Sequence, residues 1–326
     1  MTALKIAALL AGALALSTAA RAADAPQPAP GQMVDALHAA FGDHHTRAVH
    51  AKGILAEGTF TPAPEARGLS KASLFSGGTR PVLVRFSDFT GIPDIPDTAD
   101  AANPRGFALK VDLGGGQSAD VVTHSFNGFP VATSAEFRAF LLAVGASGPG
   151  AAKPTALDAF LGAHPVAVTF LTTQKPAPVS YATAAYFGVN AFRFTDAAGH
   201  AVFVRYRFVP AAGEAGLTPA ELAAKGPTYL VDELPGRLAQ GPVSFDWFAQ
   251  VAEAGDVIDN PSVAWPESRR LVKLGTVRIA RMAPDQAAIS KATVFLPANV
   301  PAGIEPADPM IGVRQGAYPI SFAHRQ

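Results

Sequence analysis

Residues 185–210 read AYFGVNAFRFTDAAGHAVFVRYRFVP, two runs that alternate between larger apolar residues and smaller or polar ones. Alternation with a period of two is typical of β-strands, and the intervening Asp196-Ala197-Ala198-Gly199 suits a tight turn. The stretch therefore predicts an antiparallel hairpin. A second hairpin is expected around Leu113-Gly114-Gly115-Gly116-Gln117. Further strands are predicted at residues 49–60, 81–88, 106–112, 120–123, 246–254 and 271–282.

Helical patterns fill the segments between these strands. They occur at residues 32–42, 134–144, 156–162, 218–225 and 231–238. Strands and helices do not alternate regularly, which disfavours a parallel doubly wound sheet. The pattern favours an α+β fold, a closed antiparallel β-barrel with appended helices. We expect a single domain over residues 32–326.

The composition excludes several classes of protein. Of the 326 residues, 49% are hydrophobic and 16% are charged, which allows a large core and excludes disorder. The net charge is zero, so nucleic acid is not an expected partner. The chain has no cysteine, which excludes thiolate catalysis, Fe–S clusters and cysteine zinc sites.

The first 22 residues have the pattern of a cleavable secretory signal peptide. Lys5 precedes an apolar run at residues 6–16, and Ala20-Arg21-Ala22 forms a small-x-small cleavage site. The apolar run is too short to span a bilayer. We therefore expect export to the periplasm without stable membrane insertion, followed by an Ala/Pro-rich flexible tail at residues 23–31.

The last helix presents a pair of residues suited to metal binding. Asp308-Pro309 predicts a helix start, and Pro319 is expected to end the helix after Tyr318. Arg314 and Tyr318 then share a face at i and i+4. A guanidinium beside a phenol stabilises the phenolate, which could be presented to ferric iron. The same spacing also suits an ordinary surface pair, which is the more common case.

The segment RAVHAKG, residues 47–53, contains a candidate general base. A neutral imidazole at His50 could take a proton from one peroxide oxygen and return it to the other. Such a base needs a partner for its second nitrogen, and Ser87 on a neighbouring strand is a candidate. Taken alone, a solvated His50 and an unremarkable strand hydroxyl are the simpler interpretations.

Several ordered motifs between Arg47 and Arg325 resemble the haem catalases. The resemblance is closest to their small exported branch, the catalase-related peroxidases. The motifs are RAVHAKG, EGTF, PVLVRFSD, NPRGFALKVDL and PADPMIGVRQGAYPISFAHR. Together they outweigh the single-residue alternatives given above.

The resemblance implies a catalase-like barrel that carries haem b and assigns roles to individual residues. His50 would be the distal base and Ser87 the residue that orients it. Tyr318 would be the iron ligand and Arg314 its stabiliser. The remaining cofactor-binding residues would be Arg47, Arg85 and Arg325 at the propionates and haem edge, and Phe137 near the distal face.

Two features depart from typical catalases. The sequence stops shortly after Arg325, so the C-terminal helical and flavodoxin-like regions of larger catalases are not expected. The distal Asn is also ambiguous. Ungapped counting from Asp120 puts Ser125 at its position, whereas Asn127 lies two residues on; we favour Asn127.

The predicted function is a haem peroxidase. It would reduce hydrogen peroxide or organic hydroperoxides with small organic electron donors, with weak catalase activity. One alternative is a fatty-acid hydroperoxide isomerase or dehydratase of the allene-oxide-synthase type. Another is a non-enzymatic periplasmic haem-binding protein. A monomer or homodimer is expected.

Overall fold

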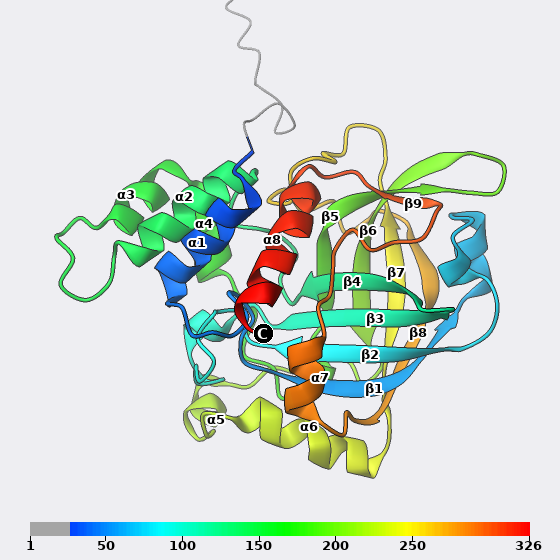
Figure 1. The fold of residues 1–326 in the computed structure, drawn as a ribbon, viewed down its shortest axis with the longest axis horizontal. Coiled ribbons are helices and arrows are strands. Elements are labelled where there is room, and N and C mark those ends of the chain that lie inside the picture. Colours follow the sequence, from blue (N-terminus) through cyan, green and yellow to red (C-terminus); the bar gives the residue numbers. More distant parts are fainter. Residues whose placement is uncertain (1–26) are drawn as a thin grey trace, which may run out of the picture.

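The computed structural model describes residues 27–326. The expected signal peptide and the first part of the expected tail, residues 23–26, lie outside the described residues. Eight antiparallel strands follow one another around a barrel, which closes where β8 pairs with β1 and β4 pairs with β5 (Figure 1). The strands are β1 Gly53–Pro62, β2 Arg80–Ser87, β3 Gly106–Gly114, β4 Gln117–His124, β5 Tyr186–Thr195, β6 Ala201–Pro210, β7 Val243–Val251 and β8 Leu271–Met282. The predicted closed barrel is confirmed.

The hairpin predicted at residues 185–210 forms β5 and β6. Thr195 pairs with Ala201 at its tip, and the Asp196 carboxylate accepts the N–H groups of Ala198 and His200 at 2.8 and 2.9 Å. Gly199 has φ of 90°, which a glycine adopts without strain. This turn fixes the register, so the alternating apolar residues point to one face.

Aromatic side chains fill the barrel. Phe107 stacks on Tyr186 with ring centroids 5.1 Å apart, and Phe208 stacks on Trp247 at 5.2 Å. All four are almost completely removed from solvent. Burying a side chain of this size contributes roughly 1.5–3 kcal/mol, so the interior is a packed core.

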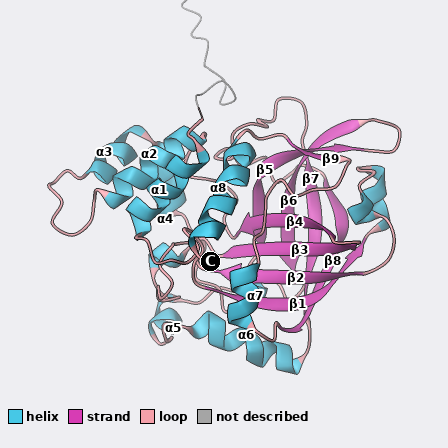
Figure 2. Ribbon diagram, in the orientation of Figure 1, coloured by secondary structure: helices cyan, strands magenta, loops and turns pink. Residues whose placement is uncertain are grey.

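Helices gather on one side of the barrel and below it (Figures 1 and 2). One group, α1 to α4, stands beside the barrel, and α8 lies between this group and the strands. The helices are α1 Pro30–Phe41, α2 Ser134–Gly145, α3 Ala156–Ala163, α4 Pro165–Thr172, α5 Pro219–Ala223, α6 Tyr229–Gln240, α7 Gln286–Ala292 and α8 Met310–His324. A short strand, β9 Ile304–Pro306, pairs with β5. Among residues 27–326, no helix has the length and apolar character needed to cross a bilayer.

Pro319 does not end the last helix, contrary to the prediction. It lies inside α8, which continues to His324. Proline removes one backbone hydrogen bond and costs roughly 3 kcal/mol inside a helix. Packing of Val313 and Ala317 against the apolar face of α1 outweighs this local preference.

Other predicted boundaries also shift. The first strand begins at Gly53, because the N–H of His50 bonds to the Phe89 carbonyl at 2.8 Å instead of joining the ladder. The strand predicted at 246–254 occupies 243–251. Pro30 and Gly31, expected in the flexible tail, form the first turn of α1. The helices α4 and α7 were not predicted.

Candidate active site

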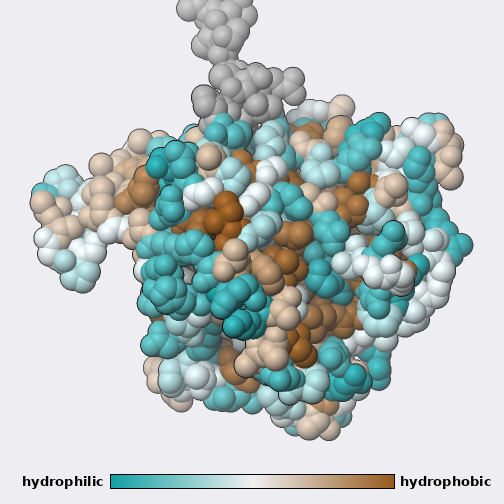
Figure 3. Space-filling model, viewed as in Figure 1, coloured by the Kyte–Doolittle hydropathy of each residue, from teal (hydrophilic) through white to brown (hydrophobic). Residues whose placement is uncertain are grey.

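A largely apolar cavity lies between the barrel and the helices α1, α2 and α8. The space measures about 1400 Å³, including the part open to solvent. On the face drawn in Figure 3, hydrophobic residues gather near the middle of the molecule, around α8. The cavity walls include every predicted site residue except Asn127: Arg47, His50, Ser87, Arg85, Phe137, Arg314, Tyr318 and Arg325.

His50 is held by the backbone in one tautomer. It has φ of 56°, an uncommon left-handed conformation that turns the chain just before β1. Its Nδ1 lies 2.8 Å from the carbonyl oxygen of Asp88 and 3.1 Å from the Ser87 hydroxyl. A carbonyl can only accept, so Nδ1 carries the proton and Nε2 keeps the basic lone pair. The contact between His50 and Ser87 was predicted from the sequence.

The close approach of His50 to the barrel requires a glycine. Gly106 on β3 pairs with Ser87 on β2. A Cβ atom at position 106 would lie 2.3 Å from the Ser87 hydroxyl and 2.8 Å from Nδ1 of His50. Both contacts are far inside van der Waals distance, so even an alanine here would displace this pair.

His50 should act as a base over the whole neutral range. Burial lowers its pKa to about 3, and the nearby positive charge of Arg85 acts in the same direction. The imidazole is therefore unprotonated from pH 5 to 8. For the peroxide reduction that the sequence resemblance implies, we predict a second-order rate constant, followed by stopped-flow absorbance, that stays nearly constant across this range. If the base had the ordinary histidine pKa of about 6.5, the rate would instead fall roughly tenfold per pH unit below that pH.

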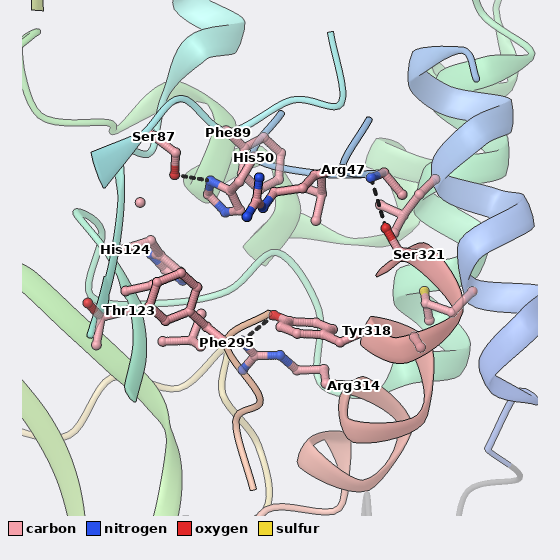
Figure 4. A pocket seen from close by; sticks show the side chains of 18 of the residues that line it. Arg47, His50, Ser87, Phe89, Thr123, His124, Phe295, Arg314, Tyr318 and Ser321 are labelled. Atoms are coloured by element: carbon pink, nitrogen blue, oxygen red, sulfur yellow. Dashed lines mark hydrogen bonds between the residues drawn. The ribbon is translucent and has the colours of Figure 1, made fainter. Parts of the chain in front are cut away.

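Tyr318 faces the same cavity from α8 and is held by a chain of polar contacts (Figure 4). Arg314 donates to the Tyr318 hydroxyl at 2.8 Å and to the side-chain oxygen of Asn190 on β5. Asn190 in turn donates to the Asp308 carboxylate at 2.8 Å. Asp308 also accepts the N–H of Met310 at 2.9 Å, at the start of the helix. The predicted Arg314–Tyr318 pair is thus anchored to the barrel.

Three guanidinium groups crowd one end of the cavity. Arg47 donates to Ser290 and Thr293, Arg85 to the Ala51 carbonyl, and Arg325 to the Thr293 carbonyl. Within the described part of the chain, no carboxylate pairs with any of them. Burial and mutual repulsion lower the pKa of Arg47 and of Arg85. Arg85 is buried, and Arg47 and Arg325 are partly buried. Three cations gathered in this way without an ion-paired carboxylate favour a ligand that brings negative charge.

A buried ionic network supports the segment behind His50. Arg105 donates to the Asp88 carboxylate and to the Asp97 carbonyl, and Lys52 pairs with the Asp97 carboxylate. The hydroxyl of Tyr181 also donates to Asp88 at 3.1 Å. Burial raises the pKa of Asp88 to about 6, and repulsion from Asp97 adds to this while Arg105 opposes it. The backbone carbonyl of Asp88 is the acceptor for His50, so the network fixes that acceptor.

Asn127 does not reach the cavity. It lies in the loop after β4, and its side-chain nitrogen is 3.4 Å from the Glu267 carboxylate. The alternative, Ser125, accepts the N–H of Arg105 at 2.8 Å. His124 lines the cavity at this point instead, and its Nε2 has no hydrogen-bond partner. The last residue of β4 is therefore the one that turns inward.

Other wall residues were not predicted from the sequence. Asn190 is buried within a run of apolar strand residues, and that exception to the pattern was the available signal. No comparable sequence signal distinguished Phe295, Ser321 or the apolar residues of α1. Ser321 accepts the N–H of Ala48 at 3.1 Å and so ties α8 to the segment that holds His50.

The donor set fits a haem group. The walls are mostly apolar, with Phe129 and Phe137 packed at 4.8 Å between ring centroids. A phenol backed by a guanidinium could bind iron, and the three unpaired arginines could hold two carboxylates. His50 and Ser87 lie on one side of the cavity, and Arg314 and Tyr318 lie on the other (Figure 4).

Known proteins resemble this chain in sequence and in fold. A family model described as Catalase matches residues 42–326. A catalase-related peroxidase of Synechococcus elongatus is 35% identical over 302 residues, covering 91% of this chain and 88% of that protein. One from Mycolicibacterium paratuberculosis is 38% identical over 301 residues, covering 91% and 94%. The structure of a bacterial catalase has a TM-score of 0.74 at 24% identity, covering 86% of this chain and 57% of that one.

Proposed function

The chain belongs to the catalase family, and we propose that it is a haem-dependent peroxidase. It is a peroxide-acting oxidoreductase, like the relatives named catalase-related peroxidases. Members of this family generally bind haem, and we propose haem b as the cofactor. The substrates would be hydrogen peroxide or organic hydroperoxides, with small organic molecules as electron donors.

One observation carries the proposal. The base His50 and the pair formed by Arg314 and Tyr318 come from distant parts of the chain and line one cavity. Among residues 27–326, no carboxylate forms an ion pair with the three arginines beside them. A single flat, apolar and dianionic group would satisfy all of these residues together.

Each of these residues would have a separate role. Tyr318 would hold the iron, and Arg314 would stabilise its phenolate by charge pairing. Arg47, Arg85 and Arg325 would hold the propionates. Bound haem supplies the redox centre at which peroxide is reduced. Nε2 of His50 would accept the proton of one peroxide oxygen and return it to the other, while Ser87 keeps the ring in place.

The proposal can be tested with purified protein reconstituted with haem. We expect stoichiometric haem binding, and peroxide-dependent oxidation of a phenolic dye that exceeds oxygen evolution. Oxygen evolution alone would make the protein a catalase. Conversion of a lipid hydroperoxide without any electron donor would make it an isomerase or dehydratase. Haem that binds but leaves peroxide unreacted would make it a carrier.

Replacing Tyr318 with Phe should weaken haem binding by at least roughly tenfold, because it removes the oxygen that would ligate iron. A haem titration followed by visible absorption measures this effect. Tyr229→Phe is the matched control, since it also removes one hydroxyl, which donates to the Pro178 carbonyl at 2.9 Å. Equal haem affinity in Tyr318→Phe and the unchanged protein would contradict the assignment of the ligand.

We also propose that the protein is exported to the periplasm. The proposal rests on the order of Lys5, the apolar run and the Ala20-Arg21-Ala22 site in the sequence. Mass spectrometry of protein from the periplasmic fraction should find a chain that begins at Ala23. Recovery of an intact Met1 in the cytoplasm would contradict the proposal.

A further inference from the structure

Two imidazoles and a carboxylate come together outside the cavity, where the last turns of α1 and α8 meet. His38 belongs to α1, Asp43 follows that helix, and His324 is the last residue of α8. One potential ligand atom from each of the three lies within 4.8 Å of the others. The rings of His38 and His324 have centroids 5.5 Å apart. The residues that would hold haem are a separate set.

The fold builds this cluster on rigid elements. Gly42 ends α1 with φ of 86° and bonds back to the His38 carbonyl at 2.8 Å. This left-handed turn, which glycine tolerates, brings Asp43 back over His38. α1 and α8 pack through an apolar cluster that contains Leu37 and Val313. The helices therefore set the backbone positions of His38 and His324, and the turn at Gly42 sets that of Asp43.

The separations suit a shared cation better than direct pairing. Nε2 of His38 lies 3.9 Å from the nearer Asp43 oxygen, too far for a hydrogen bond. In a tetrahedral zinc site with bonds of about 2.0–2.1 Å, neighbouring ligand atoms stand about 3.3 Å apart. Small rotations of these partly exposed side chains would close that difference. Nδ1 of His45 also lies 3.9 Å from the same Asp43 oxygen and could complete the coordination.

We propose that His38, Asp43 and His324 form a binding site for a divalent transition metal ion of the zinc type. Imidazole and carboxylate are ligands that such ions accept, and the three side chains with either His45 or a water molecule complete four-coordination. The Asp43 carboxylate accepts the N–H of His45 at 3.1 Å, which holds the carboxylate close to the end of α1.

A metal ion here would join the ends of α1 and α8. Both helices contribute walls to the cavity, through Leu37 on α1 and Tyr318 on α8. Binding to the folded state alone raises its stability according to the ratio of free metal to Kd. The site would therefore act as a clamp on the helical side of the cavity, separately from the peroxide chemistry.

Calorimetric titration of tag-free protein with zinc sulfate tests the proposal. We expect one equivalent of Zn²⁺ to bind, a higher unfolding temperature with zinc, and reversal of both effects by EDTA. His324→Ala and Asp43→Asn should each weaken binding at least roughly tenfold. His200→Ala is the matched control, because His200 is an exposed imidazole with its own carboxylate partner, Asp196, at 3.1 Å.

The variants must keep the fold for the comparison to count, so far-UV circular dichroism and the unfolding temperature without zinc are measured for each. Asp43→Asn keeps the size of the side chain, which guards against a folding defect. The proposal is overturned if the unchanged protein does not bind zinc. It is also overturned if His324→Ala and Asp43→Asn keep full affinity, or if His200→Ala loses as much.

Discussion

Replacing His50 with Asn is expected to slow peroxide reduction by roughly 10²–10⁴-fold, the usual contribution of a positioned acid–base group. The substitution removes Nε2, the nitrogen that keeps the basic lone pair when Nδ1 donates to the Asp88 carbonyl. Haem binding should be retained, because the cationic groups and Tyr318 are untouched. Stopped-flow absorbance after mixing the reconstituted protein with hydrogen peroxide measures the rate.

Asn is the appropriate replacement because His50 has φ of 56°. Asn tolerates this left-handed conformation better than Ala does, so the backbone turn is preserved. His44→Ala is the control, since it removes an exposed imidazole from the same loop. Ser87→Ala keeps the base but loses one of its contacts, and should give an intermediate rate. An unchanged rate in His50→Asn would remove this residue from the mechanism.

Replacing Arg105 with Met is expected to lower the free energy of unfolding by about 3–5 kcal/mol. Arg105 is fully buried and pairs with Asp88, which has no exposed surface either. Methionine fills similar space but leaves the Asp88 carboxylate buried, with Lys52 at 4.0 Å as its remaining cationic neighbour. Urea denaturation at pH 7.5 measures the loss.

The pH dependence of this loss gives a second test. The folded-state pKa of Asp88 is raised to about 6, above the unfolded value of about 3.9. The native state therefore binds the extra proton as pH falls through 6, and the contribution of this group to stability rises. Arg105 lowers the pKa of Asp88, so Arg105→Met raises this pKa further, and the variant gains more stability from protonation than the unchanged protein does. The loss of stability in Arg105→Met should therefore be smaller at pH 5 than at pH 7.5. The double variant with Asp88→Asn and Arg105→Met should also recover part of the lost free energy of unfolding, because it no longer buries an unpaired carboxylate.

The control for Arg105 is Arg281→Met, which removes a guanidinium from an exposed pair with Glu57. Such surface pairs contribute about 0–1 kcal/mol. A loss in Arg105→Met no larger than in Arg281→Met would show that the buried network does not support the barrel.

Local sequence patterns sufficed for the parts of the fold in which neighbouring residues decide the structure. Alternation and turn residues predicted the β5–β6 hairpin. The spacing of Arg314 and Tyr318 predicted a pair on one helix face, and in the structure the Arg314 guanidinium lies 2.8 Å from the Tyr318 hydroxyl. Pro319 was interpreted wrongly, because its effect depends on how α8 packs against α1. That packing is a tertiary contact with no local signature.

The candidate site shows the same division. His50 and Ser87 were paired on the strength of several motifs, and the 3.1 Å contact followed. The inward position of His124 in place of Asn127 depends on where β4 leaves the ladder. Asn190 acts through Arg314, and that contact joins residues far apart in the chain. Such placements follow from barrel closure and cannot be read from spacing.

The order in which the chain is made has a consequence for when the site exists. The barrel closes through the pairing of β1, among the first described strands, with β8, and Tyr318 comes later still on α8. The N-terminal part of a nascent chain is made first. Tyr318 therefore becomes available to face His50 only when nearly the whole polypeptide has been made. Translation products that end before α8 therefore lack one side of the cavity, and a haem group that needs both sides could bind only to finished molecules.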